Sequence, residues 1–409
     1  MNNNHNTKIS VLSQIPLGIW FIGITTTLMT ISSTIIFILT PVFLEDVLGS
    51  SVQAIGTLDG IAEAVSQIVR LFSGPISDYF GKRKTLIVLG YGLTTLAKPI
   101  FAVATAVSLF GLARFIERIG NGLQAAPREA LIGDLAPSHL KGTCFGLRNS
   151  LTKIGSVSGC LIAWYLMYTM DDYRFIFWIA IIPSIIGMFL LVSFVKDKET
   201  PKTENLTKPE RHPIYIKDII HLGNAFWGVM FVVAIFTLSH CSESFLSLRA
   251  KNLGLEVKHL PSIILVMNAV IVGIAYYAGS LSDRVGRKIF LFIGIATHVI
   301  SLVILGFAPS WEWVMLGVVF WGIQMGTTEG VLFTIVVETT PKALRGTALG
   351  VFFLIRGISL FISSTMTGYL WDAYSPLHAF GICAIVGAIS LIMLMFVHLP
   401  KIEENTLTN

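Results

Sequence analysis

Hydrophobic residues gather into twelve long runs along the chain, and short polar segments separate the runs. About 20 apolar residues make a helix long enough to cross the hydrocarbon core of a bilayer. The pattern therefore predicts an all-α membrane protein with twelve transmembrane helices. The predicted helices lie near residues 15–40, 51–77, 84–104, 107–131, 141–168 and 174–195, and then near 224–250, 258–281, 288–308, 311–337, 344–370 and 377–399.

A longer polar segment divides these runs into two sets of six. It follows residue 195 and contains several Lys, Glu and Pro residues, as expected of a solvated linker. We therefore expect an N-terminal six-helix bundle over residues 1–195, a cytoplasmic linker over 196–223 and a C-terminal six-helix bundle over 224–409.

The composition excludes an ordinary soluble protein. Charged residues make up 13% of the chain, whereas soluble proteins carry about 25%. We expect no enzyme, because the loops are too short for a catalytic domain and HExxH, Walker A and GxSxG motifs are absent. The four cysteines lie in or beside apolar runs without CxxC spacing, so no metal site or cofactor is expected.

Basic residues lie mainly in one set of alternate loops. They include Lys82 to Lys84, the central linker and Arg287 with Lys288, whereas Glu45, Asp46 and Asp172 belong to the opposite loops. By the positive-inside rule, we expect both termini to lie in the cytoplasm. The expected location of the protein is the inner (cytoplasmic) membrane. The net charge of +5 therefore reflects orientation, and no nucleic-acid partner is expected.

The two halves repeat each other in sequence. The segment from Gly74 to Arg83 reads GPISDYFGKR, and the segment from Gly279 to Lys288 reads GSLSDRVGRK, 205 positions later. A second echo pairs Asp134 with Glu338, 204 positions apart. Repeated halves with a solute site between them are typical of secondary transporters.

The repeated GxxxDxxG[RK][RK] loop resembles the signature of the major facilitator superfamily, and the resemblance extends over the whole chain. In that family the loop latches the cytoplasmic side and is broken as the carrier turns inward. Tyr79 stands where an Arg is usual, which implies a weaker charge network in the first copy. The resemblance implies gate roles for Gly74, Asp78, Gly81, Lys82, Arg83, Gly279, Asp283, Gly286 and Arg287.

The fourth predicted helix carries two further resemblances. Its stretch from Arg118 to Ala126 is similar to a family motif that places an Arg in the membrane and is associated with proton coupling. The following Pro127-Arg128-Glu129-Ala130-Leu131 resembles a "PR-acid-AL" element of a bacterial branch of mixed function, so it names no solute. The Gly155–Cys160 stretch lacks the Gly-Pro pair of drug–proton antiporters, which disfavours multidrug export.

Charged side chains recur inside the predicted helices, where each costs about 2.5–3.5 kcal/mol unless it finds a partner or a water-filled cavity. Glu63 lies four residues after Asp59, and Arg118 lies four after Arg114, so each pair shares one helix face. We expect a contact between Glu63 and Arg118. Lys98 and Arg70 are expected off the central depth, with Arg70 extending to the cytoplasmic interface.

Converging arginines predict an anion-binding centre, because a guanidinium binds a carboxylate through two parallel hydrogen bonds. Buried carboxyl groups are candidates for carrying a proton, since a low dielectric favours the neutral form. Purely structural ion pairs stay open as an alternative. The candidate substrate-binding residues are Arg118, Lys153, Arg356, Arg114, Gln324, His240 and Trp321. The candidate proton-coupling residues are Glu63, Glu117, Glu329, Asp59 and Glu243, of which Glu63 or Glu329 is preferred.

We therefore expect a proton-coupled secondary active transporter for a small polar solute that carries carboxylates, such as an organic acid or a carboxylate siderophore. The alternative is a proton-driven efflux antiporter for drugs or metabolites. A non-transporting sensor on the same fold also stays open. The expected partners are the solute, H+ and the lipid bilayer, with the protein a monomer.

Overall fold

The computed structural model describes residues 14–80, 82–170, 172–197, 222–341 and 344–397. Over these ranges the chain is helical and contains no strand. The N-terminal half holds α1 (Leu17–Val42), α2 (Val52–Phe80), α3 (Arg83–Val103), α4 (Val107–Leu135), α5 (Lys141–Met170) and α6 (Tyr173–Phe194). The C-terminal half holds α8 (Asn224–Leu238), α9 (Ser244–Asn252), α10 (Pro261–Val285), α11 (Arg287–Phe307), α12 (Trp311–Glu338), α13 (Arg345–Ala373) and α14 (Pro376–Phe396).

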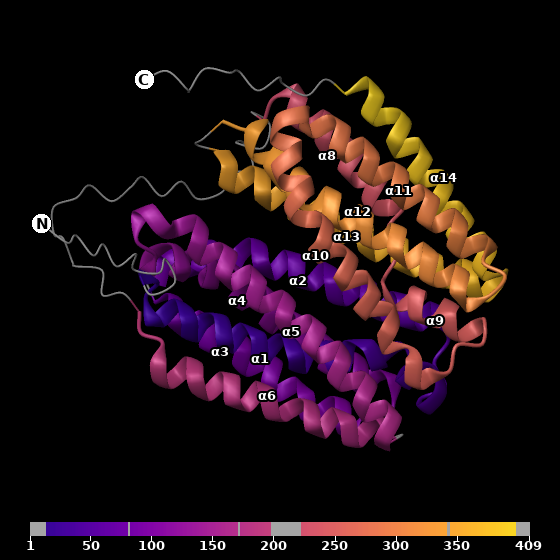
Figure 1. The fold of residues 1–409 in the computed structure, drawn as a ribbon, viewed down its shortest axis with the longest axis horizontal. Coiled ribbons are helices and arrows are strands. Elements are labelled where there is room, and N and C mark those ends of the chain that lie inside the picture. The colour runs from indigo at the N-terminus through magenta and orange to yellow at the C-terminus, as the bar shows by residue number, and fades with distance from the viewer. Residues whose placement is uncertain (1–13, 81, 171, 198–221, 342–343, 398–409) are drawn as a thin grey trace, which may run out of the picture.

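The helices form two bundles that lie side by side (Figure 1). Because α8 and α9 together make one crossing, the two bundles supply the twelve spans that the hydrophobic pattern predicts. We call the side on which α1 begins and α14 ends the terminal side, and the opposite side, near α9, the distal side.

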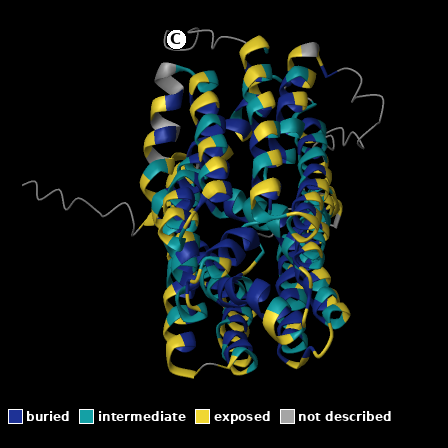
Figure 2. Cartoon of the chain, turned by 90° about the vertical axis from the view of Figure 1, so that its right-hand side faces the viewer, coloured by how far each residue is buried: buried dark blue, intermediate teal, exposed yellow. Residues whose placement is uncertain are grey.

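Eight described segments are long and apolar enough to cross a membrane by length and composition alone. The helices outside this group are α2, α4, α5 and the two short pieces α8 and α9. Large apolar side chains such as Phe189 and Phe231 are more than 60% exposed, and exposed residues recur along the outer faces of the helices (Figure 2). This surface suits lipid rather than water.

The seventh span differs from the sequence prediction, which placed one helix over 224–250. The helix stops after Leu238 and restarts at Ser244, leaving an irregular stretch of Ser, His, Cys, Ser and Glu. The Ser239 hydroxyl donates to the Phe236 carbonyl at 2.6 Å and so competes with helical bonding. Irregular backbone at membrane depth is tolerated where it is buried in protein or lines a cavity.

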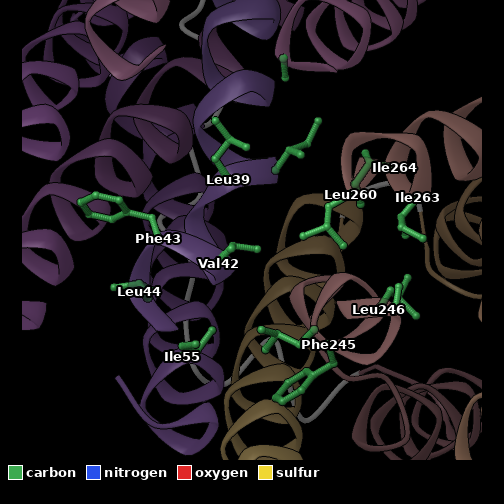
Figure 3. Packing of buried hydrophobic residues seen from close by; sticks show 14 of the residues in the cluster. Leu39, Val42, Phe43, Leu44, Ile55, Phe245, Leu246, Leu260, Ile263 and Ile264 are labelled. Carbon is green, nitrogen blue, oxygen red and sulfur yellow. The ribbon is translucent and has the colours of Figure 1, made fainter. Parts of the chain in front are cut away.

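The two halves share an apolar core only towards the distal side. Figure 3 shows this shared cluster, in which Leu39, Val42 and Phe43 belong to α1 and its end, while Phe245 and Leu260 belong to the other half. Towards the terminal side each half packs its own cluster, one around Ile19, Ile87 and Leu191 and the other around Phe226, Leu291 and Phe352. The conformation is therefore closed distally.

Small residues allow α2 and α13 to approach closely across the boundary between the halves. A Cβ added at Gly368 would lie only 2.7 Å from the Cα of Gln53, and one at Gly60 would lie 3.0 Å from the Cα of Phe361. Close backbone packing of this kind drives helix association in lipid, where apolar side chains gain little from leaving the solvent.

Polar contacts reinforce the distal closure. The Lys251 ammonium on α9 binds Glu45 at 2.7 Å and also binds Asp46, both from the N-terminal half. The Gln53 amide donates to the Asp372 carboxylate at 2.7 Å, again across the halves. The distal side is thus held by ionic contacts as well as by the shared core.

Candidate functional site

A cavity of about 430 Å³ lies between the two halves. It is lined by α1 to α5, by the break between α8 and α9, and by α12 and α13. Nine charged side chains line it: Asp59, Glu63, Glu117, Glu243, Glu329, Arg114, Arg118, Arg128 and Arg356. Both halves contribute, so the structure brings most of the candidate residues to one place.

A buried network closes the distal end of this cavity. Arg114 donates to Asp59 at 3.4 Å and to Glu117 at 3.1 Å, and all three side chains are less than 10% exposed. The second Asp59 oxygen accepts hydrogen bonds from the hydroxyls of Ser242 at 2.7 Å and Ser244 at 2.5 Å. Because these serines belong to the C-terminal half, Asp59 joins the halves as well as neutralising Arg114.

Lys98 completes the charge balance of this network, a role that the sequence analysis did not assign to it. Its side chain is fully buried, its ammonium donates to the Ser33 hydroxyl at 3.2 Å, and its charge acts on Glu117. Two carboxylates and two cations therefore offset one another. A lone Lys in an apolar helix was the signal that sequence reasoning undervalued.

The expected contact between Glu63 and Arg118 is confirmed, with 3.3 Å between the carboxylate and the guanidinium. The other Glu63 oxygen accepts from the Gln67 amide at 2.7 Å. These side chains are 22–33% exposed because they face the cavity. The pair is held from two directions by the N-terminal half alone.

Arg356 supplies the cation from the C-terminal half, and it is held more loosely. Its guanidinium lies 3.8 Å from Glu329, whose side chain is 58% exposed, and rests 5.5 Å from the ring centre of Phe352. At 3.8 Å the ionic contact is longer than a hydrogen bond. Arg356 therefore keeps free donors directed at the cavity.

Glu243 lies in the break between α8 and α9 and lines the cavity. Of the five lining carboxylates, it alone has neither an ion pair nor a side-chain hydrogen bond within the described part of the chain. The charges of Glu329, Lys153 and Arg118 act on it from a distance. A carboxyl group placed in this way can gain or lose a proton without breaking a fixed contact.

His240, also in the break, lines the cavity, stacks on the His298 ring and packs at a tilt against the Trp321 ring. Its ring centre lies 4.8 Å from that of His298 and 4.7 Å from that of Trp321. Trp321 is fully buried and Gln324 donates to Thr328 at 2.8 Å; neither lines the cavity. These two candidates therefore lie behind the site, as does His298, which the sequence reasoning did not single out.

Lys153 does not line the cavity, although its neighbour Thr152 does. The side chain is exposed, because one residue along a helix turns the direction by about 100°. Its charge still reaches Glu243. Lys153 is therefore near the cavity without being part of its lining, and the expectation that it joins Arg118 and Arg356 in one anion-binding centre stays a prediction.

Arg128 of the PR-acid-AL element lines the terminal end of the cavity. It donates to the Tyr91 hydroxyl at 3.0 Å and to Glu129 at 3.1 Å. Arg148 on α5 binds the same Glu129 oxygen. Sequence reasoning noted this element and assigned it no role, and Tyr91 carried no signal at all.

The described gate candidates lie on the terminal side, where one of them forms an ion pair in each half. Arg83 binds Asp134 at 3.0 Å, and Arg287 binds Glu338 at 2.6 Å. Each member of the second pair lies 204 positions after its counterpart in the first pair, so the repeat in sequence corresponds to a repeated ion pair in the structure.

The remaining gate candidates are described in part. Gly286 has a φ of 110°, a conformation that favours glycine, and it ends α10. Gly74 faces Ala126 of α4, and Lys82 immediately precedes α3. Gly81 lies outside the described residues, as do the surroundings of Gly279 and the side chains of Asp78 and Asp283.

The sequence matches the model of the Major Facilitator Superfamily over residues 22–364 and again over 244–408. An uncharacterized MFS-type transporter of Methanocaldococcus jannaschii is 30% identical over 97% of both chains.

Relatives with named solutes are more distant. The gentisate transporter of Corynebacterium glutamicum is 24% identical over 84% of this chain and 80% of its own. The cis,cis-muconate transport protein of Acinetobacter baylyi is 23% identical over 78% of this chain and 79% of its own. The glucose transporter GlcP of Staphylococcus epidermidis is 23% identical over 79% and 80%.

Solved structures share the fold. A D-xylose-proton symporter superposes with a TM-score of 0.72 at 16% identity, covering 94% of this chain and 98% of that one. The nucleoside transporter NupG superposes with a TM-score of 0.74 at 13% identity, covering 94% and 100%. With the cavity between two six-span bundles and the match along the whole sequence, the chain belongs to the major facilitator superfamily as a multi-pass transporter of small solutes.

Proposed function

We propose that this carrier moves a small organic anion with a carboxylate group together with a proton, and that its termini and terminal side face the cytoplasm. The observation that supports this most directly is the loose contact of Arg356. The other lining arginines have carboxylate contacts of 3.1–3.4 Å, whereas Arg356 lies 3.8 Å from an exposed Glu329. A solute carboxylate can displace Glu329 and bind the guanidinium through two hydrogen bonds.

Glu243 is the proposed proton carrier, in place of Glu63 or Glu329. No cation within the described chain forms an ion pair with it, and the Glu329 charge acts on it against the more distant influence of Lys153 and Arg118. An anion arriving at Arg356 adds negative charge nearby and so favours the protonated form of Glu243. By thermodynamic reciprocity, protonation of Glu243 then strengthens binding of the anion by the same factor.

Apolar and polar surfaces are mixed in the cavity lining. Met29, Phe37, Met325 and Leu360 line it beside the charged groups. A solute with an apolar body and a carboxylate fits both surfaces. The gentisate and cis,cis-muconate relatives transport molecules of this class, which supports the proposal, while the glucose relative does not.

The conformation suggests the order of events. With the distal side closed by the shared core and the Asp59 contacts, the cavity exchanges solute on the terminal side. Transport requires the distal contacts to break while the terminal halves approach, as in alternating access.

Uptake into proteoliposomes tests this proposal. We expect labelled gentisate or cis,cis-muconate to enter faster than glucose, and faster still when the outside is acidic. Arg356→Gln should slow carboxylate uptake at least tenfold, because a charge-assisted hydrogen bond contributes about 1.5–3 kcal/mol. Arg356→Lys should fall between, since Lys lacks the planar fork.

Arg174→Gln is the matched control for loss of an arginine. Arg174 lies on the distal side, donates to the Ala102 carbonyl at 3.2 Å and rests on the Phe43 ring, away from the cavity lining. Carboxylate uptake that equals glucose uptake, or that survives Arg356→Gln unchanged, would refute the anion proposal.

A further inference from the structure

Arg128, which lines the cavity, belongs to a larger group of charged side chains. Arg128 and Arg148 share Glu129, whose side chain is 28% exposed. Arg70 on α2 lies within reach of the charges of Arg128, Glu129, Glu63 and Arg356. We call Arg70, Arg128, Arg148 and Glu129 the mouth cluster, and its formal charge is +2.

Arg70 is the half-buried member of this cluster that forms no ion pair within the described ranges. Its guanidinium lies 4.6 Å from the ring centre of Phe353 in the C-terminal half, and no carboxylate within the described ranges forms an ion pair with it. We expected Arg70 to extend to the cytoplasmic interface of the membrane. Its guanidinium instead packs on a ring of the C-terminal half, so this side chain bridges the two halves. A guanidinium offers five donors, and the ring satisfies none of them fully.

Other polar atoms at the mouth also lack partners. Among the described residues, the Nε donors of Arg128 and Arg148 are buried without a hydrogen bond. Unpaired buried donors destabilise the folded protein. An excess of two positive charges beside unfilled donors is an arrangement that an anion stabilises.

We propose that the mouth cluster is a second anion-binding subsite, which receives the carboxylate of the solute between Arg356 and the terminal side. This inference rests on the proposed function for the identity of the solute. It gives the PR-acid-AL element a role: Arg128 presents the charge to the cavity, and Glu129 holds Arg128 and Arg148 together. Arg70 then links the subsite to Arg356.

Such a subsite would shorten the distance that an anion must travel without a counter-charge between Arg356 and the water on the terminal side. Leaving Arg356 directly for water would expose the carboxylate to the low-dielectric walls of the cavity, where an unpaired charge is costly. A second cationic site of weaker affinity lets the anion move in two smaller steps.

Benzoate binding to the purified full-length protein tests the subsite. Benzoate is titrated in detergent micelles without anionic lipid, at constant ionic strength, and benzamide is the neutral control. We expect two binding phases in the wild type. The readout is the thermal stabilisation of the protein, which grows with ligand concentration. Arg70→Gln should weaken one phase about tenfold or more, and Arg356→Gln should weaken the other.

Arg70→Gln is the principal variant because it breaks no ion pair among the described residues, so the fold should survive. Arg128→Gln is the second variant and should remove the same phase as Arg70→Gln. Arg174→Gln is the control, since it also removes an arginine that rests on a ring, 5.6 Å from Phe43 at the distal side. It should leave both phases intact.

The outcomes separate the two proposals. If Arg70→Gln and Arg128→Gln keep both phases, the mouth subsite is wrong, whatever happens at Arg356. If they lose one phase while Arg356→Gln changes nothing, the subsite stands and the midplane proposal fails. If phosphatidylglycerol stabilises the wild type over Arg70→Gln and benzoate does not, the cluster binds a lipid headgroup, and the proposal is overturned.

Discussion

The two halves hold their central charges differently, although their sequences repeat each other. In the N-terminal half, Arg114 is almost fully buried between two carboxylates, and the Glu63–Arg118 pair is supported by Gln67. In the C-terminal half, Arg356 has one long contact with an exposed Glu329. The comparison indicates that one half provides a fixed electrostatic frame and the other provides groups that exchange partners.

The largest expected effect comes from breaking the frame. Arg114→Leu leaves Asp59 buried without its cation and Glu117 with the charge of Lys98 alone, and removing one partner of a buried pair costs about 3–5 kcal/mol. We expect a marked loss of folded protein, measured by thermal unfolding in detergent. Arg356→Leu is the matched control and should cost far less. Equal losses from both variants would contradict the division between the halves.

The C-terminal half, whose groups exchange partners, is tested at the carboxyl group of Glu243. Glu243→Gln cannot release a proton, so we expect the acceleration of uptake by an acidic outside to disappear, while solute exchange at equal pH continues. The measurement is uptake and counterflow of cis,cis-muconate in proteoliposomes. Glu63→Gln is the matching variant in the N-terminal half, and it should keep the response of uptake to pH. If it abolishes the pH response while Glu243→Gln preserves it, the proton belongs to the N-terminal half.

Asp59 connects the N-terminal half with the C-terminal half, so removing its charge should shift the protein towards a conformation that is open on the distal side. Asp59→Asn weakens the contacts with Ser242, Ser244 and Arg114, and a loss of about 1.4 kcal/mol changes a population tenfold. We expect about tenfold faster labelling of Cys241, which lines the cavity, by an impermeant thiol reagent added on the distal side. The measurement uses a background without the other three cysteines. Unchanged labelling would mean that Asp59 does not help to hold the distal side closed.

The smallest effect is expected at the rim. Lys251 and its partners Glu45 and Asp46 are 22–37% exposed, and exposed ion pairs contribute about 0–1 kcal/mol. Lys251→Met should therefore raise Cys241 labelling only a few-fold in the same assay. The effect should shrink further in high salt, which screens exposed charges. A change larger than that of Asp59→Asn would place the main distal contact at the rim.

Hydropathy and the repeat in sequence were sufficient to predict the twelve spans, because apolar length is dictated by the bilayer. Helical spacing was sufficient for Glu63 and Arg118, which share the facing sides of neighbouring helices. The break at Ser239 to Glu243 was not predicted, since a short polar run inside an apolar one resembles a helix with a polar stripe. Its irregular backbone follows from local hydroxyl hydrogen bonds.

The site was harder to predict than the fold, because depth along a helix says little about direction. Lys153 and Thr152 have nearly the same depth, yet only Thr152 lines the cavity. Trp321 and Gln324 lie at the right depth but behind other side chains. Contacts between segments far apart in sequence, such as Asp59 with Ser242, depend on the packing of the halves, which one sequence does not reveal.

The short helix α9 leads to a mechanical consequence. Its start is fastened to the N-terminal half through Ser244 and Asp59, and its end through Lys251 and Glu45. The chain is irregular before it and turns at Gly254, with a φ of 92°, after it. A nine-residue rod only about 13 Å long is thus tied at both tips to the neighbouring bundle, while Arg249 between the tips binds the Leu305, Gly306 and Ala308 carbonyls of its own half. Opening of the distal side therefore has to release both tips of this one helix, while its middle stays with the C-terminal bundle.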